Sequence, residues 1–98
     1  MQINLSGHHV DITDGIREAV DTKFTKVGGH HPQLDEVAVT VTVDKNEQSV
    51  EAKSQYMGAP VVVQSSDKDM YAAIAAAAKK FDSALSHRKG VTKSAKHA

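Results

Sequence analysis

The residues best suited to chemistry in this 98-residue chain are basic, and they gather in its last fifth. Residues 79–98 contain six Lys/Arg and one Asp, a net charge of +5, whereas residues 1–78 contain six Lys/Arg and eleven Asp/Glu, a net charge of −5. Such an asymmetry indicates an end that faces a polyanion. Basic residues also favour helix C-termini through the helix dipole, but that effect covers one turn and the basic run continues to Lys96.

The other groups that could bind a ligand are two histidine pairs, His8-His9 and His30-His31. Neutral imidazoles can bind zinc, nickel or copper. No Cys or acidic residue lies at a metal-type spacing from them, and adjacent side chains of an extended chain point in opposite directions. We therefore expect no physiological metal and no cofactor, and a protonated histidine can instead approach a phosphate. Adventitious metal binding is expected, at most, at His8, His9, His30 and His31.

The motifs of a catalytic site are missing from the sequence. Gly28-Gly29 follows an expected helix rather than a strand and lacks a nucleotide-loop pattern, and no serine stands in a nucleophile elbow. Zero Cys excludes thiol catalysis and disulfides. The acidic pairs Asp35–Glu36 and Asp67/Asp69 are explained better as a strand start and a helix cap. We expect a protein that is not an enzyme.

Hydrophobic periodicity predicts the order β-α-β-β-β-α for the elements that position these residues. The expected strands are 2–6, 36–44, 49–57 and 61–65, with a turn at Gly58-Ala59-Pro60. The expected helices run from a Thr13 cap to a stop at Gly28-Gly29, and from a Ser66 or Asp67 cap to a stop at Gly90.

These elements predict an α+β fold. A right-handed crossover makes the first two strands parallel and the others antiparallel. Each helix has one apolar face, so both should cover the same side of a four-stranded mixed sheet, forming a two-layer sandwich. Residues 1–90 are expected to form one domain, and residues 91–98 a short, basic, flexible tail.

The expected location is cytoplasmic. The N-terminal segment MQINLSG lacks the charged and apolar blocks of a signal peptide, and the longest apolar run, Ala72 to Ala78, is too short to span a membrane. The absence of Cys is consistent with this location.

If the two helices pack side by side, their basic residues should form one groove across the helical layer. Lys23 and Lys26 contribute from the first helix, and Lys80, Ser83 and His87 share one row of the second. Arg88 and Lys89 follow in the next turn, then Lys93 and Lys96 in the tail. Such a groove favours salt-dependent binding to the backbone of structured RNA, while the scarcity of strand aromatics argues against base stacking.

The segment DMYAAI, residues 69–74, resembles the ribosome hibernation factors, the family of the short hibernation promoting factor and the ribosome-associated inhibitor. The resemblance runs from Met1 to about Lys89. Its other pieces are MQINLSGHHVDIT, IREAVDTKFTKV, LDEVAVTVTVDK and the basic end after DMYAAI. The family is also similar in length and in the order of its elements.

The resemblance implies binding to the small ribosomal subunit and its ribosomal RNA in the decoding channel of the 70S ribosome, over the messenger RNA and A- and P-site transfer RNA sites. It implies a block of translation, and protection of idle ribosomes, in stationary phase or stress. Lys79 ranks lower among the implied contacts because the family is often acidic there. The candidate rRNA-binding residues are Lys23, Lys26, Lys79, Lys80, His87, Arg88, Lys89 and Lys93.

This chain also departs from the family pattern. The family commonly has a basic residue where Ser83 stands and a Lys where His87 stands, so phosphate contacts should be fewer or more pH-dependent. The lack of a long C-terminal extension implies the short promoting type, a monomer in solution, which is linked to ribosome dimers formed with a modulation factor. The alternative hypothesis is a protein-interaction module, such as a sigma-factor modulator without rRNA binding.

Overall fold

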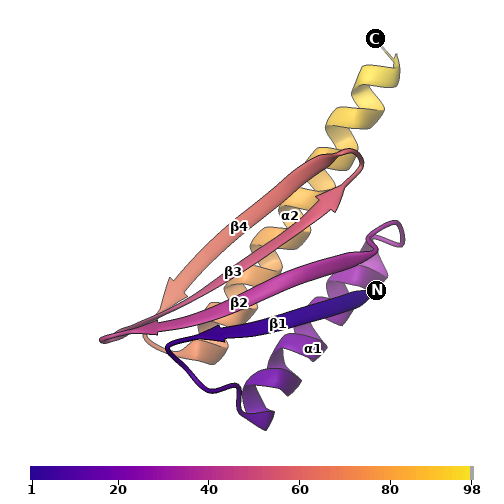
Figure 1. The fold of residues 1–98 in the computed structure, drawn as a ribbon. Coiled ribbons are helices and arrows are strands. Elements are labelled where there is room, and N and C mark those ends of the chain that lie inside the picture. The colour runs from indigo at the N-terminus through magenta and orange to yellow at the C-terminus, as the bar shows by residue number, and fades with distance from the viewer. Residues whose placement is uncertain (98) are drawn as a thin grey trace.

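The computed structural model describes the backbone of residues 1–97 and the side chains of residues 1–89. Its elements are β1 (Gln2–His8), α1 (Asp14–His30), β2 (Glu36–Asp44), β3 (Glu47–Tyr56), β4 (Ala59–Asp67) and α2 (Met70–His97). The strands form one sheet in the order β1-β2-β3-β4, in which β1 is parallel to β2 and the other pairings are antiparallel. Both helices cover the same face (Figure 1), so the predicted two-layer α+β sandwich is confirmed.

The strands follow their hydrophobic alternation, and β2 has the predicted bounds. Val37, Val39 and Val41 are fully buried against the helices, while Ala38 and Thr40 between them lie half-buried on the open face. The predicted turn at Gly58-Ala59-Pro60 is wrong by one residue. Met57 and Gly58 have positive φ angles of 51° and 82°, the geometry of a tight hairpin turn, so β4 already begins at Ala59.

Helix α1 begins at the predicted cap and ends later than predicted. The amide of Ile16 donates to Thr13 Oγ1 at 3.2 Å, as an N-cap requires. The predicted stop at Gly28-Gly29 is wrong because the backbone amide of His31 donates to the carbonyls of both Val27 and Gly28, at 3.2 Å each. Pro32 then prevents a further turn.

Helix α2 differs from its prediction at both ends. Ser66 and Asp67 belong to β4, so Asp69 caps the helix instead, accepting from the amide of Tyr71 at 3.2 Å. The predicted stop at Gly90 is wrong, because the helix continues to His97. A glycine inside a helix costs only about 1 kcal/mol relative to alanine, so it does not by itself end the helix. The side chains of the expected tail, residues 91–98, lie outside the part of the chain whose side chains the structure describes.

The core lies between the sheet and the two helices. The stripe predicted on α2 is buried in full, namely Met70, Ile74, Ala77, Phe81 and Leu85. Phe81 of α2 meets Phe24 of α1 with ring centroids 6.0 Å apart. Ala73 and Ala77 are fully buried, and their small side chains allow α2 to lie close to the sheet. This packing holds the two helices side by side.

Candidate nucleic-acid interface

A groove of about 270 Å³ lies between α1 and α2. Lys23, Lys26 and His30 line it from α1, where their i, i+3 and i+7 spacing places them in one row. Lys79 and Asp82 line it from α2, one turn apart. The groove is therefore lined by three lysines, a histidine and one carboxylate.

The three lysines of the groove are available to a ligand. Lys23, Lys26 and Lys79 are all exposed. Within residues 1–89, their ammonium groups have no ion-pair or hydrogen-bond partner. Three uncompensated positive charges at one groove attract phosphate groups, and such contacts require no particular base sequence.

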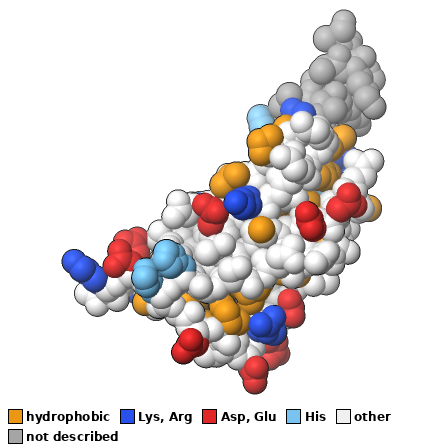
Figure 2. Space-filling view, viewed as in Figure 1, with side chains coloured by type: hydrophobic (Ala, Val, Ile, Leu, Met, Phe, Trp, Pro, Cys, Tyr) orange, Lys and Arg blue, Asp and Glu red, His pale blue; other side chains and the backbone are white. Residues whose placement is uncertain are grey.

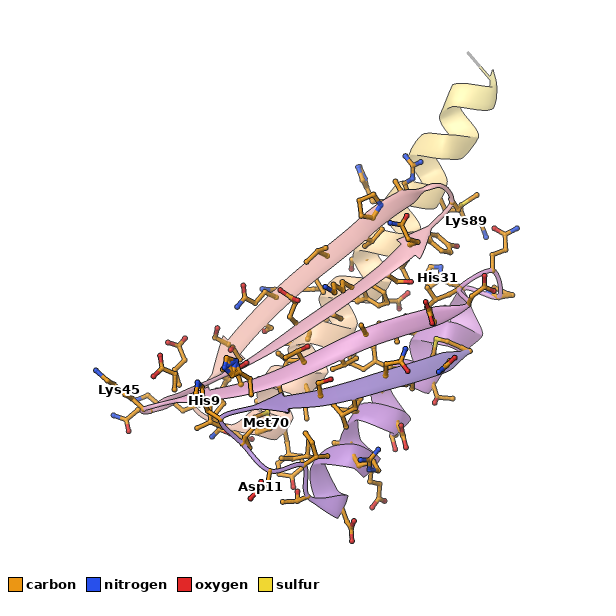
Figure 3. The ribbon with its side chains drawn as sticks, viewed as in Figure 1. His9, Asp11, His31, Lys45, Met70 and Lys89 are labelled. Carbon is orange, nitrogen blue, oxygen red and sulfur yellow. The ribbon has the colours of Figure 1, made fainter. Side chains whose placement is uncertain are left out.

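Asp82 connects the groove to the end of α1. His30 Nδ1 lies 3.0 Å from Asp82 Oδ2, and His31 Nε2 lies 2.5 Å from Asp82 Oδ1. His31 is only 4 % exposed, and its ring meets the ring of Tyr56 edge-on at 5.9 Å. Figure 3 shows His31 and Lys89 at one end of the sandwich, and His9 and Lys45 at the other.

The two histidines keep Asp82 ionised. Burial of the Asp82 carboxyl group works to raise its pKa, but the hydrogen bonds from His31 and His30, and the charge these rings can carry, outweigh it. The pKa of Asp82 is therefore lower than its ordinary value. At neutral pH the groove contains a permanent carboxylate that both histidines hold in place.

The lowered pKa of Asp82 predicts a pH-dependent contribution to stability. A carboxyl group whose folded pKa is depressed stabilises the fold above its unfolded pKa, and this contribution disappears as the pH falls through the folded pKa. We expect Asp82→Asn to lower the free energy of unfolding at about pH 5, with the difference from wild type shrinking toward about pH 2. Urea unfolding of both proteins at a series of pH values measures this difference in the free energy of unfolding.

Asp21→Asn is the matched control for this titration, because Asp21 is exposed on α1 and has no ion-pair partner in the described part of the chain. Its stability difference should stay small across the range. A constant effect of Asp82→Asn down to about pH 2 would show that the carboxylate–histidine contacts do not stabilise the fold.

Lys80 and Arg88 lie on the other flank of α2, which corrects the expected single groove. Lys80 Nζ donates to the carbonyl of Gln64 in β4 at 3.0 Å, and Arg88 Nη2 donates to the carbonyl of Met57 at 2.8 Å. Successive residues of a helix point about 100° apart, so Lys79 faces α1 while Lys80 faces β4. The structure thus brings Lys79, rather than Lys80 and Arg88, together with Lys23 and Lys26.

The remaining candidate residues lie near the end of the described part of α2. His87 and Lys89 are exposed and do not line the groove. Lys93 lies outside the described side chains. His30 and Asp82 were missed as groove residues. The signal available for Asp82 is that it is the single acidic residue among residues 79–98.

The histidine pairs do not form a metal centre in the described part of the chain. No group of three or more His, Cys, Asp or Glu residues there is arranged to hold a metal ion. His8 and His9 stack their rings at a centroid distance of 4.0 Å, and His30 and His31 both contact Asp82.

A larger hollow, of about 540 Å³, lies where the β2–β3 turn meets the end of β4. Its charged lining is Asp44, Lys45, Glu47, Asp67 and Lys68. Because acids outnumber lysines, this hollow suits a polyanion less well than the helical groove. On the open side of the sheet, acidic and basic side chains are interspersed (Figure 2). The groove between the helices is therefore the best candidate for binding a polyanion.

An α+β sandwich with a cationic groove between its helices defines a class of small binding domains. The chain belongs to the family described as Sigma 54 modulation protein / S30EA ribosomal protein, whose model matches residues 3–93. This family consists of ribosome-binding proteins that are not enzymes. No described helix is long and apolar enough to cross a membrane.

Relatives and solved structures agree with this family. The chain is 41 % identical over 85 residues to the ribosome hibernation promoting factor of Azotobacter vinelandii, covering 87 % of this chain and 79 % of the relative. It is 42 % identical over 89 residues to the factor of the same name from Pseudomonas putida, covering 91 % and 87 %.

The fold matches a ribosomal subunit interface protein from Coxiella burnetii, with a TM-score of 0.86 and 23 % identity over 92 % of this chain and 99 % of that one. It also matches the N-terminal domain of Protein Y from Thermus thermophilus, with a TM-score of 0.78 and 26 % identity over 87 % and 96 %. At 23 % identity, the match to the Coxiella burnetii structure shows similarity of fold alone.

Proposed function

We propose that this chain is a ribosome hibernation factor that binds ribosomal RNA of the small subunit through the groove between α1 and α2. One observation carries the proposal. Lys23, Lys26 and Lys79 line the same groove, and their ammonium groups have no ion-pair or hydrogen-bond partner among the described residues. Identities of 41 % and 42 % to proteins named ribosome hibernation promoting factor support it.

The proposed mechanism is occupation of an RNA-lined site rather than catalysis. Lysines bind the phosphate backbone as point charges, and structured RNA is recognised mainly through its shape and backbone. Bound in the decoding channel, over the messenger RNA and the A- and P-site transfer RNA sites, the domain blocks translation and preserves idle 70S ribosomes under stress or in stationary phase. The location implied by this role is the cytoplasm.

Sedimentation through sucrose gradients with purified ribosomes, at low and at moderate salt, tests the proposal. We expect the protein to sediment with the small subunit and with 70S particles, and to dissociate steeply as salt rises. Each phosphate contact contributes a slope of about 0.7 to 0.9 in log K against log salt. A peak of paired ribosomes, with a modulation factor present, would indicate the promoting type. Protein that stays at the top of the gradient at both salts would refute the proposal.

A protein-interaction module is the second candidate, because the description of the matched family includes modulation of sigma 54. The outer strand β1 leaves one edge of the sheet unpaired, and extended peptides can add to such an edge. A stoichiometric protein partner captured after nuclease treatment, in the absence of ribosome binding, would favour this candidate.

A further inference from the structure

We propose that His30 is a fourth phosphate-binding side chain of the groove, and that it binds phosphate in its protonated form with Asp82 as its counter-ion. This inference rests on the proposed RNA-binding function of the groove. On this inference, His30 takes up one proton when RNA binds to the groove. The affinity of the groove for RNA therefore depends on pH.

The position of His30 carries the first step. It lies one helical turn after Lys26 in the row that lines the groove, and its side chain is 54 % exposed. Its Nδ1 is committed to Asp82 Oδ2 at 3.0 Å. The Nε2 atom has no protein partner within residues 1–89, so it is the nitrogen left for a ligand.

The second step follows from counting hydrogens on the imidazole. An ionised carboxylate only accepts hydrogen bonds, so Nδ1 of His30 carries a hydrogen and donates it to Asp82. A neutral imidazole has one N–H, which leaves Nε2 with a bare lone pair that cannot bond to a phosphate oxygen. Binding therefore takes one proton from a hydronium ion or a buffer acid, whose bond to that proton breaks as the Nε2–H bond forms.

The charged groups around His30 determine when this proton is bound. Lys23 and Lys26 from α1 and Lys79 from α2 line the same groove and oppose a positive imidazole. Asp82 from α2 favours it, and a bound phosphate adds a second favourable anion. Proton uptake is thus linked to the arrival of the phosphate.

The counter-ion is held in place from its buried side. His31 Nε2 contacts Asp82 Oδ1, and His31 itself packs against Tyr56 of β3, the group that faces it from the sheet. Because both carboxylate oxygens are engaged, Asp82 cannot turn toward the lysines without breaking a contact. The carboxylate remains directed at His30 while RNA occupies the groove.

The test compares binding to purified small ribosomal subunits at about pH 6 and about pH 8, at constant ionic strength, for wild type, His30→Gln and His8→Gln. We expect wild type to bind about fivefold more tightly at the lower pH, and His30→Gln to lose most of that gain. Glutamine can still donate to Asp82 but cannot be protonated. His8→Gln, which changes an exposed histidine at the end of β1, outside the groove, should keep the gain.

Calorimetry of the same binding reaction in two buffers of different ionisation enthalpy counts the protons taken up. Wild type should take up more protons than His30→Gln at about pH 7. If His30→Gln keeps the pH dependence and the proton uptake of wild type, the inference is wrong and the proposed function stands. If wild type binds the subunits at neither pH, the proposed function fails and the inference falls with it.

Discussion

The double substitution Lys23→Glu/Lys26→Glu is expected to weaken binding to small ribosomal subunits by roughly one to two orders of magnitude at moderate salt. Both lysines line the groove and have no partner in the described part of the chain, so reversal replaces two attractive charges with two repulsive ones. The negative slope of log K against log salt should become shallower by about two. Sedimentation or filter binding over a series of salt concentrations measures both quantities.

Lys53→Glu is the matched control for this substitution. Lys53 is exposed on β3, where it alternates with the buried Ala52 and so points away from the helices. It changes the net charge in the same direction, by half as much as the double substitution, without touching the groove, and binding should stay near that of wild type. Equal losses for the control and the double variant would mean that overall charge, rather than the groove, determines affinity.

The substitution Phe81→Ala is expected to cost about 3 to 5 kcal/mol of the free energy of unfolding. Phe81 is fully buried, and its ring meets that of Phe24 at 6.0 Å. These are the chain's two phenylalanines, so their contact is a large part of an otherwise aliphatic core. Since small domains have a stability of about 5 to 15 kcal/mol, much of the fold's stability should be lost. Urea unfolding followed by circular dichroism measures the change.

Two further variants separate packing from other causes. Phe81→Leu keeps most of the apolar volume and should cost less than half as much as Phe81→Ala. Val62→Ala, at a side chain that is 58 % exposed on β4, should change stability by about 0.5 kcal/mol or less. A Phe81→Ala protein that unfolds at the urea concentration of wild type would contradict the burial of this ring between α1 and α2.

Elements with strong local patterns could be predicted from the sequence. The Val/Thr alternation of β2 predicts its bounds because a period of two is incompatible with a helix. Thr13 predicts the start of α1 because its side chain can accept from an amide three residues on. The apolar stripe of α2 predicts the buried face, and two one-faced helices then require the same side of the sheet.

Helix ends were less predictable because competing contacts decide them. Whether Gly28 ends α1 depends on the His31 amide, which finds two carbonyl acceptors and extends the last turn. Gly28 also accommodates the Met1 side chain, since a Cβ there would lie 2.9 Å from Met1 Cε. The cap of α2 shifted to Asp69 because pairing with β3 retains Asp67 in the sheet.

The composition of the groove depended on tertiary geometry. The sequence predicts Lys23 and Lys26 on one helix face, but it does not determine whether Lys79 or Lys80 turns toward them. The contacts of Asp82 with His30 and His31 join residues 52 and 51 positions apart, and no local pattern encodes such pairs. Only the isolation of one acid within a basic segment marked Asp82 in advance.

Lys80 has a consequence for solubility as well. Strand β4 is the outer strand next to β3, and an outer strand with free backbone groups is a template for edge-to-edge aggregation. The ammonium group of Lys80 occupies one carbonyl of this strand, and Pro60 within it has no amide to donate. A positive charge and a missing donor along one edge discourage a second copy of the sheet from pairing there. One basic residue of α2 therefore helps to prevent edge-to-edge aggregation of this protein.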